Sequence, residues 1–386
     1  MIIDTISIIA CVLIVLLTIE SIIANPFFRN IRSRDDDDFS VTDAESIDEL
    51  PKLSVIVLAN NNFEALDAHL PLLLTQDYAP GYEVIVVGEK GDFHTENVLQ
   101  QYAHNKHLYA TYIPHRSLFM SKQKLAVALG VKAAHNEWIM LVDSTCRPQS
   151  DVWLKTMASS MDREANLVIG YSNYCADTKP YCRFDRLRTA CYLLRRAHRS
   201  TAYRAGGTNI AFRRSEFIAQ DGYRGNLQLV NGEYDFIVNK YARPLSTRVV
   251  LDEDAWVRED EPSSRTWHSR NISYAHVRKF LERSSAHRSL FNFDMASMYV
   301  NYLLLATMIA LASIFGKWII LGVAIAALIA TLVIRSMLAN KYYRQFEADL
   351  KAWETPFYEL AIVWHNLSTK IRYSKADQYD FTTHKL

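Results

Sequence analysis

The stretch EWIMLVDSTCRP, from Glu137 to Pro148, joins an apolar run to a single aspartate and then to small polar residues. An apolar run of this length, bounded by polar residues, is typical of a strand that is buried on both faces of a sheet. Such a strand would deliver Asp143 to the edge of the sheet, where side chains can meet a ligand. The stretch therefore predicts both a parallel sheet and a cleft at its edge.

Strand and helix patterns alternate ahead of this stretch. Strand-like runs are KLSVIVLANN (52–61), YEVIVVGEKG (82–91) and LYATYIP (108–114), and helical patterns cover residues 65–74, 95–102 and 122–134. This alternation predicts an α/β fold with a mostly parallel sheet and flanking helices. Because ligands of such sheets lie beyond the carboxyl ends of the strands, we expect one cleft where Asn60-Asn61, Gly88-Glu89 and Asp143 meet, with Ala59 and Asn61 among the residues that bind its ligand.

Apolar segments at both ends of the chain are long enough to span a bilayer. The first runs from Thr5 to about Ala24 with a single charge, Glu20. A cleaved signal peptide would have a basic start and a shorter apolar run, so the acidic MIID start favours an anchor. The second block, Met295 to Ile334, is divided at Gly316-Lys317, which indicates a transmembrane helical hairpin. A buried soluble hairpin is the alternative.

Lys and Arg residues flank these segments on the side of the large middle region, whereas the hairpin turn carries one lysine. The positive-inside rule then predicts that the middle region and the tail are cytoplasmic. The expected organisation is a transmembrane anchor (1–28), an acidic linker (29–50), a cytoplasmic domain (51–290), a transmembrane hairpin (295–335) and an amphipathic cytoplasmic tail (336–386). The aromatic and basic tail suits either the lipid headgroup region or packing against the cytoplasmic domain.

Composition excludes some classes of partner. Lys and Arg total 43 against 42 Asp and Glu, a net charge of +1, so no nucleic-acid partner is expected. The five cysteines form no CxxC pair and no zinc-like spacing with histidines. We therefore expect free thiols, which fits a reducing compartment.

Several segments, in order, resemble glycosyltransferase family 2 and, more narrowly, its bacterial membrane-anchored branch. They are SVIVLANNN, QDYAPGYEVIVV, SKQKLAVALGVKAAHNEWIMLVDSTCRPQSDVWL, GTNIAFRRSEF and GEYDFIV, within about residues 53–287. The resemblance implies the Rossmann-like GT-A fold, a nucleotide-sugar donor, a divalent metal (Mg²⁺ or Mn²⁺) and inverting transfer. It also implies a lipid-linked or polysaccharide acceptor and membrane lipids as partners, at the inner membrane of a bacterium.

The metal motif departs from the family pattern. A departing diphosphate needs a metal ion or cationic side chains to stabilise its charge, and hard cations prefer carboxylate ligands. Asp143 matches the first aspartate of the motif, which makes it the predicted metal ligand and a donor-binding residue. Thr145 stands where the second carboxylate is expected, so a metal ion would lose a ligand here.

The segment GEYD, residues 232–235, matches the part of the family that supplies the general base. Tyr234 takes the position of the usual base, but a phenol with a pKa near ~10 is a poor proton acceptor at neutral pH. Glu233 and Asp235 are therefore the catalytic candidates. The alternative is that both acids cap or solvate the start of a helix.

The remaining candidates bind the nucleotide-sugar by resemblance. Glu89 occupies the place of the nucleoside-contacting acid, Lys124 lies near the expected donor, and Arg270 falls in TWHSRN, an altered form of the basic-aromatic motif. Each also has a structural reading, as a turn acid, a surface lysine and part of an interfacial basic helix.

Three altered motifs leave several functions open: an active transferase, a metal-independent transferase with Lys or Arg at the diphosphate, and a non-catalytic scaffold in envelope-glycan synthesis. Measurements of donor binding with and without manganese would separate these functions, because they differ in whether the cleft binds the donor and whether binding depends on the metal.

Overall fold

The computed structural model describes residues 5–31, 50–59, 62–115, 117 and 120–383, and the chain divides into two compact units. The helical unit comprises Met1–Asn30 and Arg283–His365, and the sheet unit comprises Ile31–Glu282 and Asn366–Leu386. Residues 32–49, most of the expected acidic linker, lie outside the described residues, as does Asn61.

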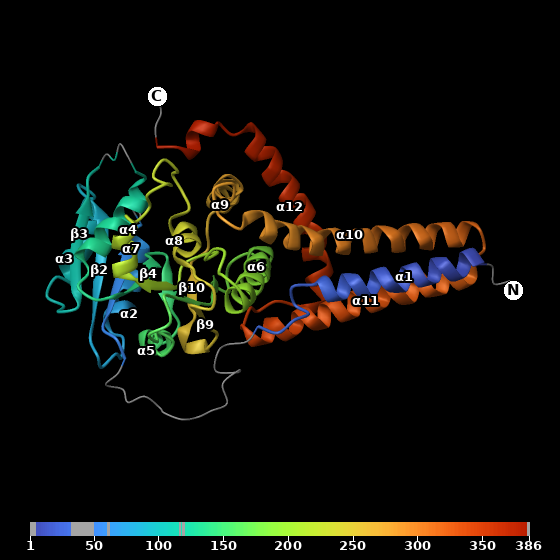
Figure 1. Ribbon diagram of the computed structural model, residues 1–386, viewed down its shortest axis with the longest axis horizontal. Coiled ribbons are helices and arrows are strands. Elements are labelled where there is room, and N and C mark those ends of the chain that lie inside the picture. Colours follow the sequence, from blue (N-terminus) through green and yellow to red (C-terminus); the bar gives the residue numbers. More distant parts are fainter. Residues whose placement is uncertain (1–4, 32–49, 60–61, 116, 118–119, 384–386) are drawn as a thin grey trace. The chain divides into compact units, whose positions relative to one another are not determined.

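The sheet unit is built on a seven-stranded sheet with the order β3-β2-β1-β4-β8-β6-β9, flanked by helices (Figure 1). Neighbouring strands are parallel except around β8, which runs antiparallel to β4 and β6. The predicted mostly parallel α/β sheet is therefore confirmed. The strands are β1 (Leu53–Leu58), β2 (Tyr82–Glu89), β3 (Leu108–Ile113), β4 (Trp138–Asp143), β6 (Leu167–Gly170), β8 (Ile210–Arg213) and β9 (Thr247–Val250).

The helices of this unit begin at residues suited to capping. Asn62, Asp92 and Ser121 each precede a helix, and each side chain accepts a hydrogen bond from the backbone N–H three residues on. Side chains of these types satisfy N–H groups that lack partners within the helix. The helices are α2 (Phe63–Leu74), α3 (Phe93–Gln101), α4 (Lys122–Ala133), α5 (Trp153–Ala158), α6 (Pro180–Arg199), α7 (Arg214–Ala219), α8 (Glu233–Tyr241), η3 (Glu253–Ala255) and α9 (Ser264–Val277).

The core explains why the apolar runs are continuous rather than alternating. Every residue of β1 and β4 is buried, as expected for strands covered on both faces. Helix α4 approaches β1 closely at Gly130, where an added Cβ would lie 2.7 Å from the Ile56 side chain. A glycine at this position therefore sets how near the helix can lie to the sheet.

A second, three-stranded sheet lies beyond the end of β4. It consists of β5 (Cys146–Pro148), β10 (Val257–Glu259) and β7 (Ser172–Tyr174), in the order β5-β10-β7. The register pairs Glu259 with Cys146 on one side and with Tyr174 on the other. This sheet therefore places Glu259 just past Asp143 and Thr145, although these residues are far apart in sequence.

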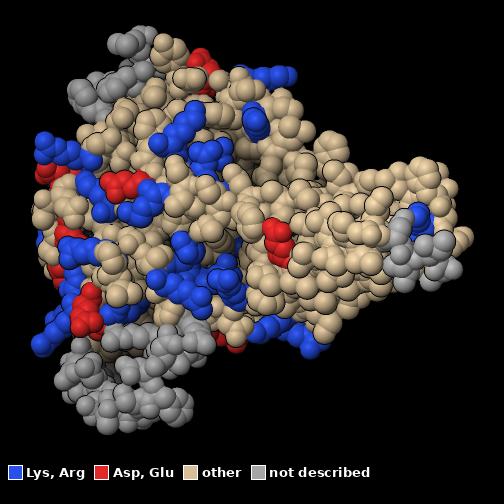
Figure 2. Space-filling model, turned by 45° about the vertical axis from the view of Figure 1, so that its right-hand side comes forward, with Lys and Arg blue, Asp and Glu red and all other residues tan. Residues whose placement is uncertain are grey.

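The helical unit contains three helices that, among the described residues, are long and apolar enough to cross a membrane. They are α1 (Thr5–Ala24), α10 (Ser284–Ile314) and α11 (Trp318–Gln345). α10 and α11 form a hairpin that turns at Gly316, whose φ of +64° favours glycine, and both extend beyond the expected bounds 295–335. The surface over these helices is largely free of charged side chains (Figure 2).

The tail contains η4 (Ala352–Glu354), α12 (Thr355–Lys375) and η5 (Gln378–Phe381). Its last part packs within the sheet unit, where the Phe381 ring stacks on His276 with 4.6 Å between ring centroids. A bridge between Leu229 and Thr382 adds backbone pairing. The end of the tail thus packs against other residues of the sheet unit.

Candidate active site

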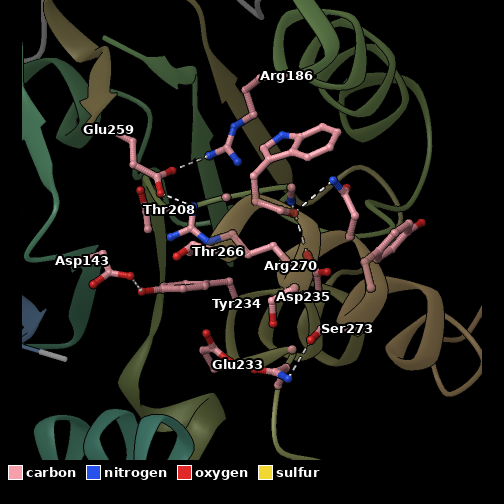
Figure 3. A pocket seen from close by; sticks show the side chains of 18 of the residues that line it. Asp143, Arg186, Thr208, Glu233, Tyr234, Asp235, Glu259, Thr266, Arg270 and Ser273 are labelled. Atoms are coloured by element: carbon pink, nitrogen blue, oxygen red, sulfur yellow. Dashed lines mark hydrogen bonds and ion pairs between the residues drawn. The ribbon is translucent and has the colours of Figure 1, made fainter. Parts of the chain in front are cut away.

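One cavity of about 690 Å³ opens beside the end of β4 and is lined from β4, α6, α8, α9 and β10 (Figure 3). Four of the residues proposed from the sequence line it together: Asp143, Glu233, Asp235 and Arg270. Thr145 and Tyr234, the two departures from the family pattern, line it as well. The cavity therefore brings together the residues on which the predicted chemistry depends.

Asp143 is held by Tyr234. The Tyr234 hydroxyl donates a hydrogen bond to Oδ2 of Asp143 across 3.3 Å. Burial, followed by the negative charge of Asp143, raises the pKa of Tyr234 well above its ordinary value. The phenol therefore keeps its proton at neutral pH and acts as a donor to Asp143.

The loop after Asp143 is tied to its surroundings by backbone groups. The Ser144 hydroxyl donates to the Ala59 carbonyl across 3.0 Å, and the Asp260 N–H donates to the Thr145 carbonyl across 2.9 Å. His69 Nδ1 lies 2.9 Å from the Ser144 carbonyl, which can only accept, so this nitrogen carries the proton. Ala59 thus supports the loop through its carbonyl and is not among the residues that line the cavity.

Glu233 is the first residue of α8 and follows Gly232, whose φ of +96° favours glycine. Its carboxylate is buried, and Oε2 has no hydrogen-bond partner among the described residues. Burial raises the pKa of Glu233 to about 7, and the negative charge of Asp143 contributes in the same direction. A carboxylate with this pKa can accept or release a proton near neutral pH.

Asp235 is engaged differently from Glu233. It lies 3.5 Å from an Arg204 guanidinium nitrogen and accepts a hydrogen bond from the Gly206 N–H across 3.3 Å. Arg204 in turn lies over the Tyr274 ring at 3.8 Å from the centroid. Asp235 therefore holds the segment around Gly206 in place.

Glu259 lies between two arginines on the opposite wall of the cavity (Figure 3). Its Oε2 is 3.4 Å from Arg186 Nη2, and its Oε1 forms a close ion pair with Arg270 Nη1. A Cβ at Gly207 would lie 1.9 Å from the same Arg186 nitrogen, so this glycine leaves room for the guanidinium. The sequence reasoning missed Glu259 and Arg186, since neither belongs to a recognisable motif.

Two other candidates lie elsewhere, and neither is among the described residues that line the cavity. At the end of β2, Glu89 accepts hydrogen bonds from Lys122, 2.7 Å from each oxygen, and the bonding to Lys122 holds the pKa of Glu89 below its usual value. The buried Lys124 ammonium donates to the carbonyls of Asn226 (2.8 Å) and Leu229 (2.6 Å). Burial lowers the pKa of Lys124 to about 8.

The acids of the cavity do not form a set suited to a divalent cation. Among the described residues no group of three or more His, Cys, Asp or Glu side chains could hold a metal ion. Asp143 accepts from Tyr234, Asp235 faces Arg204, and Glu259 is paired with Arg186 and Arg270. Magnesium and calcium take several oxygen ligands, and the neutral Thr145 hydroxyl is a weak substitute for a carboxylate. Among the described residues, the predicted metal ligand Asp143 therefore belongs to no group of three or more such ligands.

Comparison with known proteins agrees with this architecture. Residues 54–219 match the model of glycosyl transferase family 2. The mannosyltransferase PcManGT from Pyrobaculum calidifontis, solved with GDP-Man and Mn²⁺, is 16% identical over 84% of this chain and 98% of its own, with a TM-score of 0.50. S. aureus TarS 1-349 with UDP-GlcNAc is 14% identical over 81% and 92%, with a TM-score of 0.42. No curated protein matches the chain.

The sheet unit therefore resembles the GT-A fold of glycosyltransferases. Residues 54–219, less than half of the chain, match the glycosyl transferase family 2 model.

Proposed function

We propose that the protein is a membrane-bound glycosyltransferase that transfers a sugar from a nucleotide-sugar to a lipid-linked or polysaccharide acceptor at the inner face of a bacterial cell membrane. The observation that carries the proposal is Glu233, whose buried carboxylate has an oxygen without a partner among the described residues and lines the same cavity as Asp143. The GDP-Man in the mannosyltransferase structure supports a nucleotide-sugar donor. The three long apolar helices support membrane attachment.

In this proposal Glu233 is the general base. The acceptor oxygen forms a bond to the anomeric carbon of the sugar, the bond from that carbon to the diphosphate breaks, and the acceptor proton passes to Glu233. With a pKa of about 7, roughly half of the Glu233 carboxyls are ionised at neutral pH. Asp235 is a weaker candidate for this role because it faces Arg204.

Arg186 and Arg270 are proposed to neutralise the departing nucleoside diphosphate. Guanidinium groups bind phosphate oxygens in a bidentate manner and keep their charge at all physiological pH values. Both arginines line the cavity, and Glu259 balances their charge. The diphosphate would compete with Glu259 for these guanidinium groups, and this arrangement needs no metal ion.

A non-catalytic scaffold is the second candidate function. The neutral Thr145, the engagement of Asp143 by Tyr234 and the pairing of both arginines with Glu259 all favour it. A protein of this kind would bind a nucleotide-sugar or a glycan without turning it over.

Calorimetry of the purified full chain with a panel of nucleotide-sugars, in EDTA and then in manganese, tests the proposal. Binding in EDTA followed by release of nucleoside diphosphate in the presence of membrane lipid acceptors is the expected result. Binding without turnover would favour the scaffold, and no binding anywhere in the panel would overturn the donor site. Protease accessibility from each side of the membrane tests the proposed topology, with residues 51–290 and 336–386 in the cytoplasm.

A further inference from the structure

Helix α12 carries a stripe of large apolar side chains that are exposed. Phe357, Leu360, Trp364, Leu367 and Ile371 follow one another at spacings of three and four residues and are 64%, 45%, 72%, 44% and 46% exposed. At 3.6 residues per turn these five side chains fall within an arc of about 80°. A continuous exposed apolar face of this kind marks an interaction surface.

The opposite face of the helix is the one that packs on protein. Thr355, Glu359 and Ile362 are buried and lie on the other side of the helix from the stripe. The Tyr299 hydroxyl donates to the Glu359 carbonyl across 2.7 Å, and Arg335 forms a bidentate ion pair with the Glu359 carboxylate. These contacts within the helical unit turn the stripe away from α10 and α11.

The same contacts place the helix at a definite depth. Arg335 lies seventeen residues after Trp318, the first residue of α11, which is about 25 Å along the helix axis. Tyr299 lies fifteen residues before Ile314, the end of α10, which is about 22 Å. With the charged hairpin turn at one boundary of a hydrocarbon core of about 30 Å, Glu359 lies within several ångströms of the other boundary.

We propose that α12 lies along the membrane surface and inserts its apolar stripe between lipid headgroups and acyl chains. The inference rests on α1, α10 and α11 as membrane spans, and it does not depend on sugar transfer. An in-plane helix buries its apolar face by about 5–10 Å, which matches the depth of Glu359. Exposed Lys370, Arg372 and Lys375 at the end of the helix suit an anionic headgroup layer.

Quenching of tryptophan fluorescence by lipid tests the proposal. The full chain would be reconstituted into vesicles of phosphatidylcholine and phosphatidylglycerol, with or without bromine on the acyl chains near the headgroup. Trp364→Phe keeps an aromatic side chain on an exposed position, so the fold should not change. Part of the tryptophan fluorescence of the wild type should be quenched by brominated lipid. Most of the fluorescence that is lost in Trp364→Phe should belong to this quenched part.

Two matched variants calibrate the measurement. Trp318→Phe, at the start of α11, should also remove fluorescence that brominated lipid quenches. Trp256→Phe removes a buried ring of the sheet unit, so it should remove only fluorescence that the lipid does not quench. If Trp364→Phe behaves like Trp256→Phe, the stripe is not in lipid and the proposal is overturned. A stable dimer with unquenched Trp364 would overturn it in favour of a second copy as the occupant.

Discussion

The hydroxyl of Tyr234 donates a hydrogen bond to the carboxylate of Asp143 across 3.3 Å, and both side chains line the cavity at the end of β4. Tyr234 stands where the family resemblance places the general base, and Asp143 stands where it places the metal ligand. The first residue thus holds the second through a hydrogen bond. The two substitutions, Thr145 and Tyr234, are therefore structurally connected: one removes a ligand, and the other supplies a donor to the aspartate that remains. The first prediction follows from this connection.

Thr145→Asp combined with Tyr234→Phe should create a manganese site. The new carboxylate adds a hard oxygen ligand, and removal of the phenol hydroxyl releases Asp143. We expect Mn²⁺ to bind at least about tenfold more tightly than to the wild type, measured by calorimetry without nucleotide, which corresponds to about 1.4 kcal/mol. Tyr234→Phe alone is the control and should gain little. If the wild type bound Mn²⁺ as tightly as is expected for the double variant, the wild-type cavity would already hold the ion.

Glu233→Gln should abolish most sugar transfer while leaving donor binding intact. The amide fills the same space but accepts no proton, and loss of a general base typically costs ~10²–10⁴-fold in rate. The wild-type rate should rise with pH to a plateau above about 7, because only the ionised carboxylate accepts the proton. Asp235→Asn is the matched comparison. It should weaken the contacts of Asp235 with Arg204 and the Gly206 N–H and leave most of the transfer rate unchanged. A larger rate loss in Asp235→Asn would assign the base to Asp235.

The same Glu233→Gln substitution should change how stability depends on pH. The pKa of Glu233 is about 7 in the folded chain and near its ordinary value of 4.5 when the chain is unfolded. Between these values the folded state binds more protons, so the carboxyl costs stability progressively as pH rises and fully above pH 7. Gln removes this cost, and the variant should gain about 2–3 kcal/mol on the wild type between pH 5 and pH 8.

Urea unfolding of both proteins at the two pH values is the measurement. A gain that is the same at pH 5 and pH 8 would mean that Glu233 titrates normally. Because the substitution removes a buried charge, a stabilised but inactive variant is the expected combination, as at many sites where function opposes stability.

Gly207→Ala should displace Arg186 without unfolding the protein. The added methyl would lie 1.9 Å from a terminal guanidinium nitrogen, which is the mobile end of a long side chain. We expect weaker nucleoside diphosphate binding with a stability change below about 1 kcal/mol. Arg186→Gln should weaken binding by a similar factor, and the double variant should be no worse than either alone, because both remove the same contact. Additive losses would mean that Gly207→Ala acts by a route other than Arg186, and unchanged binding in Arg186→Gln would place Arg186 outside the donor site.

Local patterns predicted the strands β1, β2 and β4 and helix α4 closely, because their apolar runs and polar caps are encoded within short segments. The antiparallel strand β8 and the pairing of Glu259 with Arg186 depend on residues far apart in sequence, 73 positions in the second case. Lys124 shows the same limit. A lysine at a helix start suggests a surface position, and only packing against Asn226 and Leu229 reveals that its ammonium is buried.

The ion pair of Arg335 and Glu359 has a consequence for biosynthesis. Arg335 belongs to the last of the long apolar helices, and its carboxylate partner follows 24 residues later in the chain. An unpaired guanidinium within the bilayer is costly, so α11 is incompletely stabilised until the ribosome has passed Glu359. The Ser21 carbonyl, already synthesised with α1, accepts a hydrogen bond from the same guanidinium. A chain truncated before Glu359 would leave the Arg335 guanidinium without its carboxylate partner and with its contacts to the Ser21 carbonyl and hydroxyl, so α11 reaches its stable position only after Glu359 has been synthesised.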